Sequence, residues 1–156
     1  MHTPRTSIVP ALALLGAGLA SASADSSVVC PTTPNSVGPG ATLTWVGPFD
    51  PDLGRIVVDG ATPNAGGIVV YGYQAPATPY GDGTLCSGPV TWNLARKRTD
   101  ANGRMVLDIE QEGDADDLLW LDWPGNTEFV FQYMYRDGSG GPAGFNLTEA
   151  VLVRWE

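Results

Sequence analysis

Residues 127–137 read TEFVFQYMYRD, and the alternation along this stretch decides the fold. Successive side chains of a strand point to opposite faces, so every second residue here shares a face. Four aromatic residues fall on one such face: Phe129, Phe131, Tyr133 and Tyr135. Aromatic residues favour strands and pack well on a pleated, buried surface. The pattern predicts a core-facing strand, and an aromatic platform for a ligand is the alternative interpretation.

A second strand is expected to return along the first. Residues 138–142 read GSGGP, where glycine permits turn conformations and proline cannot donate a ladder hydrogen bond. The apolar segment 145–155 follows, with Val151, Val153 and Trp155 on one face. We expect the chain to fold around this hairpin.

The rest of the chain consists of short apolar segments separated by turns. The expected strands are 42–46, 55–59, 68–73, 84–86, 90–94, 104–110 and 118–123. Segment 68–73 is apolar on both faces, which indicates an interior strand. Glycine and proline punctuate the connections, and a turn is expected at 87–89. The sequence therefore predicts an all-β fold, an antiparallel β-sandwich of about eight strands, jelly-roll-like or immunoglobulin-like.

Residues 1–24 have the features of a signal peptide. A short, weakly basic start precedes an apolar run, 8–20, that is too short to span a membrane. Small residues at alternate positions follow, and we expect cleavage after Ala24. The mature protein would be one β-sandwich domain, 25–156, that is exported to the medium, the cell surface or the periplasm.

Removal of this leader changes the charge of the chain. The precursor has 8 basic and 17 acidic residues, a net charge of −9, and the leader holds Arg5 and the only histidine, His2. The mature chain therefore keeps seven basic residues against 17 acidic ones, a net charge of −10. Such a chain repels nucleic acids and anionic membranes, so we expect neither nucleic-acid binding nor membrane insertion.

The mature chain keeps two cysteines, Cys30 and Cys86. An even number in an exported chain argues for a disulfide, with two free thiols as the alternative. A bridge would tie the mature N-terminus to the middle of the domain. On a chain-entropy treatment it would stabilise the fold by about 4 kcal/mol.

Common catalytic residue types are missing from the mature chain. Without histidine there is no Ser-His-Asp triad, no Cys-His dyad and no histidine-containing zinc or iron site. A disulfide would also remove the thiolate nucleophile. Paired carboxylates could still hydrolyse a glycoside, but the acidic residues are too numerous to single out a pair. We expect no catalytic residue and no cofactor.

An acidic run extends from Asp108 to Asp117. Three of its residues lie in or beside a turn with Gly113: Asp114, Asp116 and Asp117. The favoured interpretation is a solvated edge that discourages strand aggregation. The alternative is a calcium site, because calcium prefers clustered carboxylate and carbonyl oxygens. Asp82, between two glycines, is either a turn former, which we favour, or a further oxygen ligand.

Aromatic residues beside turns are candidates for ligand binding, because aromatic rings can stack on the faces of sugars. Tyr80, Trp92 and Trp123 have this position, although packing is the simpler role for them. Trp45 and Trp120 are expected in the core.

Several motifs resemble parts of one uncharacterised domain that recurs in exported proteins of environmental bacteria. The residues FQYMYRD at 131–137 and GFNLT at 144–148 are similar to its ending, FQYWYRD followed by GFNLS/T. Similar pieces lie upstream in order: CP at 30–31, PNSVG at 34–38, YGDGTLC at 80–86 and TDANG at 99–103. The chain departs from the pattern at Met134 and near Glu112. The resemblance spans about 30–155 and implies an exported domain without an established activity.

Three functions remain open at this point. The leading one is an exported, non-catalytic interaction module for an unknown surface or matrix partner or glycan. The second is a carbohydrate-binding module, with or without calcium, and the third is a small glycosidase that uses paired carboxylates. An exposed aromatic strip beside a groove would favour sugar binding, and two carboxylates about 5–10 Å apart in a cleft would favour the enzyme.

Overall fold

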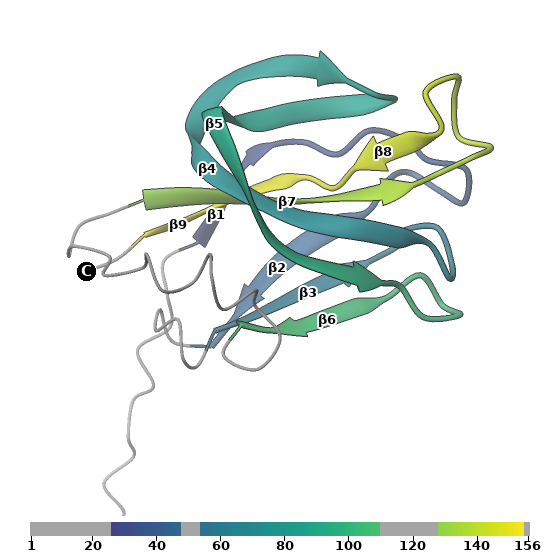
Figure 1. The fold of residues 1–156 in the computed structure, drawn as a ribbon, viewed down its shortest axis with the longest axis horizontal. Helices are drawn as coiled ribbons and strands as arrows, with labels where there is room; N and C mark the ends of the chain where they lie inside the picture. Colours follow the sequence, from purple (N-terminus) through teal and green to yellow (C-terminus); the bar gives the residue numbers. More distant parts are fainter. Residues whose placement is uncertain (1–25, 48–53, 110–127, 155–156) are drawn as a thin grey trace, which may run out of the picture.

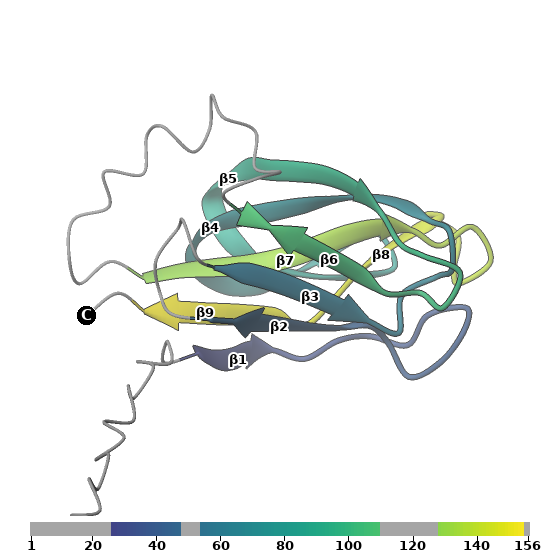
Figure 2. The ribbon, with the colours of Figure 1, turned by 90° about the horizontal axis from the view of Figure 1, so that it is seen from below.

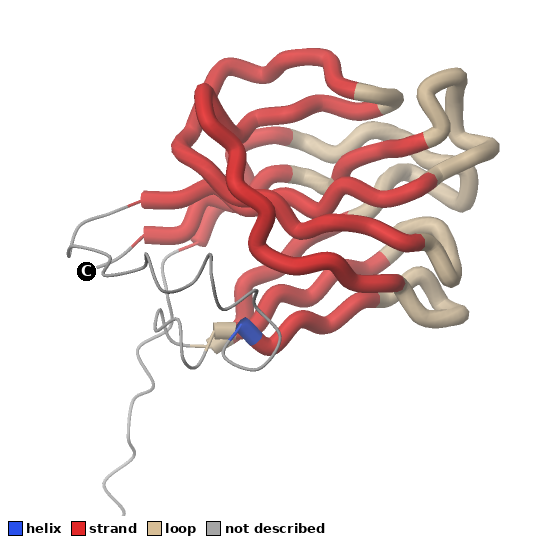
Figure 3. The backbone as a smooth tube through the Cα atoms, in the orientation of Figure 1, coloured by secondary structure: helices blue, strands red, loops and turns tan. Residues whose placement is uncertain are grey.

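The chain folds into two antiparallel sheets. The computed structural model describes residues 26–47, 54–109 and 128–154, and these contain nine strands (Figure 1, Figure 3). In chain order they are β1 (Ser26–Cys30), β2 (Thr42–Val46), β3 (Arg55–Asp59), β4 (Gly66–Tyr80), β5 (Gly83–Arg98), β6 (Met105–Asp108), β7 (Glu128–Arg136), β8 (Phe145–Leu147) and β9 (Ala150–Arg154). The predicted all-β antiparallel sandwich is confirmed. None of the described segments forms a helix with the length and hydropathy that a bilayer span requires.

The sheets differ in size. The larger has the strand order β1-β9-β7-β4-β5, with β8 also paired to β7, and the smaller has the order β2-β3-β6. Figure 2 shows the smaller sheet lying across one face of the larger one. The strands expected at 42–46 and 55–59 match β2 and β3, and β6 is shorter than the expected 104–110. Strand β1 was not predicted, and segment 118–123 lies outside the described residues.

The predicted hairpin forms the middle of the larger sheet. β7 pairs with β4 on one edge and with β8 and β9 on the other. The return segment is two strands rather than one, because Thr148 leaves the regular ladder. Its Oγ1 accepts a hydrogen bond from the backbone N of Tyr133 at 2.9 Å. Its carbonyl instead accepts one from the side chain of Gln132 at 3.1 Å.

The aromatic face of β7 forms the main core, as predicted. Phe131 and Tyr133 are fully buried, and Phe129 and Tyr135 nearly so. Phe131 packs against Trp45 of the smaller sheet, with ring centroids 5.4 Å apart. The core placement expected for Trp45 is confirmed, since its side chain is buried in the same cluster. Trp120 lies outside the described residues.

β4 and β5 form one long hairpin. The prediction of a turn at 87–89 is therefore wrong. Gly88 and Pro89, joined by a cis peptide bond, lie inside β5. The pairing jumps from Gly72 opposite Thr91 to Gln74 opposite Ser87, so the residues between them bulge out of the ladder. A bulge bends the strand without ending it. The far half of the hairpin consequently curls over the outer face of the larger sheet (Figure 1).

A disulfide fixes this curled half. Cys30 of β1 and Cys86 of β5 are bridged, with Cα atoms 6.2 Å apart, which confirms the predicted pairing. Both cysteines are buried in a second apolar cluster with Val130, Ala150 and Leu152. The outer face of the larger sheet is therefore partly covered, and the covering hairpin is covalently tied to the N-terminal strand.

The buried Gln132 connects the curled hairpin to the sheet by hydrogen bonds. Its Oε1 accepts from the backbone N of Cys86 at 2.8 Å, and its Nε2 donates to the carbonyl of Thr84 at 2.9 Å. A buried amide is tolerated only when such partners satisfy it. Gln132 on β7 is thus bonded both to the curled half of β5 and to Thr148, which lies between β8 and β9.

Candidate functional site

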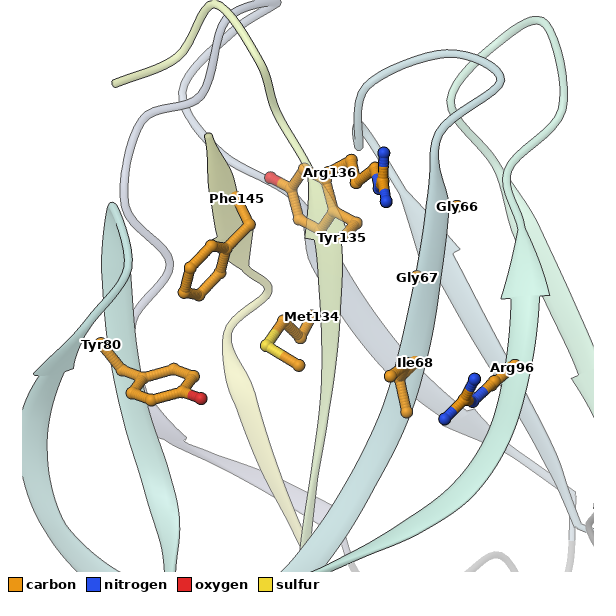
Figure 4. Close-up of a pocket in the computed structure, with 9 residues that line it drawn as sticks. All are labelled: Gly66, Gly67, Ile68, Tyr80, Arg96, Met134, Tyr135, Arg136 and Phe145. Carbon is orange, nitrogen blue, oxygen red and sulfur yellow. The ribbon is translucent and has the colours of Figure 1, made fainter. Parts of the chain in front are cut away.

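A groove remains on the outer face of the larger sheet where the curled hairpin does not cover it. Its volume is about 390 Å³. Six side chains line it: Ile68, Tyr80, Arg96, Met134, Arg136 and Phe145. Figure 4 shows Tyr80 and Phe145 on one side of the groove, Arg96 on the other and Met134 between them.

The sheet register positions the floor of the groove. Ile68 of β4 lies opposite Arg96 of β5 and opposite Met134 of β7. Arg136 lies opposite Phe145 of β8. Because alternate residues of β7 point into the core, Met134 and Arg136 are left on the outer face. The alternation that buries the aromatic residues therefore also builds the groove.

The tip of the curled hairpin forms one wall. The rings of Tyr80 and Phe145 meet edge to face, with centroids 5.5 Å apart. Glycine at 81 makes this approach possible, since its φ is +64° and an added Cβ would lie 2.3 Å from the Phe145 ring. The backbone N of Asp82 donates to the carbonyl of Phe145 at 3.0 Å, which fixes the tip against β8.

Asp82 holds the loop that precedes Phe145. Its carboxylate accepts hydrogen bonds from the backbone N of Ala143 at 3.1 Å and of Gly144 at 2.9 Å. These bonds support the turn-forming role that the sequence favoured. The carboxylate therefore positions the aromatic wall of the groove.

Two arginines border the groove without a partner among the residues that the structure describes. Three other arginines form ion pairs: Arg55 with Asp108, Arg104 with Asp59, and Arg154 with Glu128. Within the described ranges, by contrast, Arg96 and Arg136 make neither an ion pair nor a side-chain hydrogen bond, and no Asp or Glu lines the groove. Both guanidinium groups point toward β4, from opposite sides (Figure 4).

Two neighbouring glycines of β4 have opposite surroundings. A Cβ added at Gly67 would lie 2.3 Å from the buried ring of Tyr133, whereas one added at Gly66 would meet nothing within 4 Å. Gly66 faces outward, opposite Arg98 of β5. A second hollow of about 590 Å³ shares Gly66 and Arg136 with the groove, so the concave surface continues toward Arg98.

The tyrosines on the inner side of the sheet are structural. Burial raises the pKa of Tyr133 to about 12, and burial likewise raises the pKa of Tyr135. The Tyr133 hydroxyl donates to the carbonyl of Lys97 at 2.9 Å, and the Tyr135 hydroxyl accepts from Nδ2 of Asn35 at 2.9 Å. Both phenols therefore stay neutral and hold the strands that carry the groove.

The buried Asp137 has all its bonds inside the fold. Its carboxylate accepts hydrogen bonds from the backbone N of Ser36 at 3.0 Å, from the Ser36 hydroxyl and from the Thr62 hydroxyl at 2.9 Å. Its side chain is fully buried. This network ties the loop before β2 and the loop before β4 to the end of β7, and it leaves no carboxylate oxygen directed at solvent.

The structure separates the sequence candidates for ligand binding. Tyr80 lies in the wall of the groove and is 46% exposed. Trp92 lies elsewhere, half-buried at the end of the main core, with its ring 5.4 Å from Tyr71 and 5.9 Å from Tyr73. Trp123 lies outside the described residues.

The proposed calcium ligands also lie outside the described residues, namely Asp114, Asp116 and Asp117. Asp108, from the start of the same acidic run, pairs with Arg55. In the part of the chain that the structure describes, no three His, Cys, Asp or Glu side chains lie close enough to hold a metal ion.

Five of the six groove side chains were not predicted as ligand-binding candidates: Ile68, Arg96, Met134, Arg136 and Phe145. Alternation did place Met134 and Arg136 on the face opposite the aromatic residues, which was a usable signal. The pairing of β5 with β4 and the curl of the hairpin, which bring the other residues to that face, have no local sequence signal.

Comparison with known proteins adds no functional assignment. No protein-family model matches the chain, and no curated protein and no solved structure gives a match. The fold and the site define a disulfide-bonded β-sandwich with a concave, partly apolar surface that two arginines border.

Proposed function

We propose that this chain is an exported, non-catalytic β-sandwich module that binds an extracellular glycan in the groove of the larger sheet. The observation that carries the proposal is the exposed Tyr80 ring beside the Met134 floor, at the edge of a defined hollow. The leader-like residues 1–24 and the disulfide both support export.

The size and shape of the groove favour a sugar over a protein partner. A hollow of about 390 Å³ falls in the range of small-molecule sites, which is roughly 300–1,000 Å³. Stable protein interfaces instead use about 800 Å² of surface on each partner. A sugar ring can place its apolar face on Tyr80 and its hydroxyl groups toward the arginines and solvent.

The composition of the groove favours binding over hydrolysis. Glycosidases use two carboxyl groups that flank the scissile bond. Among the described residues the groove is lined instead by aromatic, aliphatic and cationic side chains. We therefore propose a module that recognises its ligand without changing it.

The test uses a substitution that fills the groove while leaving the fold intact. Gly66→Val places a side chain in open space within the hollow, in a strand, where β-branched residues are favoured. Gly38→Val is the matched control, because Gly38 also faces open space but does not line the groove. Both variants and the unmodified protein are screened on immobilised polysaccharides.

The proposal expects the unmodified protein and Gly38→Val to retain the same glycans, and Gly66→Val to lose them at unchanged thermal stability. Retention of no glycan by the unmodified protein would refute the proposal. If Gly66→Val retained the glycans equally well, the ligand would bind outside the groove.

A further inference from the structure

We propose that the glycan carries carboxylate groups, and that Arg96 and Arg136 bind a uronic-acid carboxylate between them. This inference rests on the proposed function, since it names the class of sugar that the same groove takes. It goes beyond that function because a neutral glycan would fit the aromatic wall equally well.

The distribution of positive charge is the first observation. The chain has a net charge of −9, and its described arginines are mostly engaged with carboxylates or with a carbonyl. Arg96 and Arg136 come from different strands and border one hollow without an anionic partner among the described residues. An acidic protein that leaves two guanidinium groups unpaired at one site is complementary to an anion there.

The geometry of the strands is the second observation. Arg96 and Arg136 lie on β5 and β7, one on each side of β4. Arg96 is level with Ile68 and Arg136 follows Tyr135, which is level with Gly67, so the two backbones are about 10 Å apart across the sheet and about 7 Å apart along it. Both side chains point inward over β4 (Figure 4). A planar guanidinium group matches a carboxylate with two parallel hydrogen bonds. A carboxylate held above β4, at a level between Gly66 and Ile68, would lie between these two long side chains, one reaching it from each neighbouring strand.

The apolar floor is the third observation. Ile68 and Met134 lie between the two arginines and the aromatic wall, and both are partly buried. An apolar surface lowers the local dielectric constant, which strengthens an ion pair at its edge. A ring that rests on Met134 and Tyr80 would direct an attached carboxylate toward the arginines. The groove thus combines a place for the sugar ring with a place for its acid group.

The test compares matched oligomers whose acid groups are either free carboxylates or neutral methyl esters. Oligomers of galacturonic acid and their fully methyl-esterified forms are titrated into the unmodified protein by calorimetry. The same titrations use Arg96→Gln and Arg136→Gln, with Arg104→Gln as a control that removes one positive charge outside the groove. Gly66→Val reports whether any binding observed occurs in the groove.

The inference expects the acid oligomers to bind at least tenfold more tightly than the esters. Each groove variant should weaken acid binding by about tenfold to a hundredfold, as expected for loss of a charged hydrogen-bond pair. Arg104→Gln should bind like the unmodified protein, and Gly66→Val should lose binding.

Two results would overturn the inference in different ways. Equal binding of acid and ester, lost in Gly66→Val, would leave the proposed glycan module standing and refute the carboxylate preference. A site in the groove would be refuted if Arg104→Gln weakened acid binding as much as Arg96→Gln does and Gly66→Val left acid binding intact. A general lack of binding to any polysaccharide would refute the proposed function as well.

Discussion

At the scale of single residues, glycine has different structural roles at two adjacent positions of β4. Gly67 faces the core, where the buried Tyr133 ring occupies the space that a Cβ would need. Gly66 faces the groove, where the space is open. The first glycine is therefore required by packing, whereas the second leaves the groove open. The sequence alone presents both as the same strand-weakening residue.

We predict that Gly67→Ala and Gly66→Ala affect stability in opposite directions. Gly67→Ala forces a methyl group against a ring that a hydrogen bond to Lys97 holds, and should cost about 1–3 kcal/mol. Gly66→Ala removes backbone freedom from the unfolded chain and should add up to about 1 kcal/mol. Urea unfolding of the two variants measures both effects. A stable Gly67→Ala variant would contradict the packing of Tyr133.

The buried tyrosines predict how stability depends on alkaline pH. The pKa of Tyr133 is raised to about 12 and that of Tyr135 is also raised, both through burial. The neutral phenols are thus favoured in the folded state. The contribution of Tyr133 is complete below its unfolded pKa, near 10, and is lost as pH rises toward 12. The contribution of Tyr135 is likewise lost as pH rises above the unfolded value.

Between these pH values we expect the free energy of unfolding to fall by up to about 1.4 kcal/mol per pH unit through Tyr133, and Tyr135 acts in the same direction. Urea unfolding at pH values across this window measures it, and Tyr133→Phe should make the slope shallower. A free energy of unfolding that stays constant across the window would show that the two phenols ionise freely in the folded protein.

At the scale of elements, the curled hairpin determines what the larger sheet exposes. Sequence patterns correctly predicted β2, β3 and the hairpin of β7, because each has local alternation. They divided β5 at Gly88 and Pro89, which have the composition of a turn. Glycine and proline occur in bulges as well as in turns, and only the pairing with the partner strand determines which of the two forms. For this reason the curl over the outer face was not predicted.

We predict that the disulfide and Gln132 together hold this hairpin in place. Removing the bridge with Cys30→Ala and Cys86→Ala should cost about 2–5 kcal/mol. Gln132→Leu leaves the backbone N of Cys86 and the carbonyl of Thr148 without their partner, which should cost about 1–3 kcal/mol for each of these buried groups.

Hydrogen exchange measured by mass spectrometry distinguishes local opening of the hairpin from global unfolding in these variants. Amides of the curled half, 73–87, should lose protection before those of β7, because the hairpin loses its attachment while the main core remains. Thr44→Ala, an exposed change in β2, is the control and should leave exchange unaltered. Simultaneous loss of protection in β7 and in the hairpin would contradict the separate attachment.

At the scale of the whole molecule, the groove is a product of tertiary structure. Its side chains come from β4, β5, β7 and β8. The sequence marked Tyr80 as a candidate because it stands beside a turn, and alternation separated Met134 from the aromatic face. Arg96 could not be recognised, because its role depends on strand pairing across β4 and on the absence of an ion pair. Both properties depend on residues far from it in the chain.

Whether this groove is the ligand site can be read from a chemical-shift titration. Backbone amide and methyl signals of the labelled protein are followed while oligomers of galacturonic acid are added. We expect saturable shifts confined to Ile68, Tyr80, Arg96, Met134 and Phe145 and their immediate neighbours, with none in β2, β3 or β6. Saturable shifts centred on another surface, with the signals of these five residues unchanged, would contradict it.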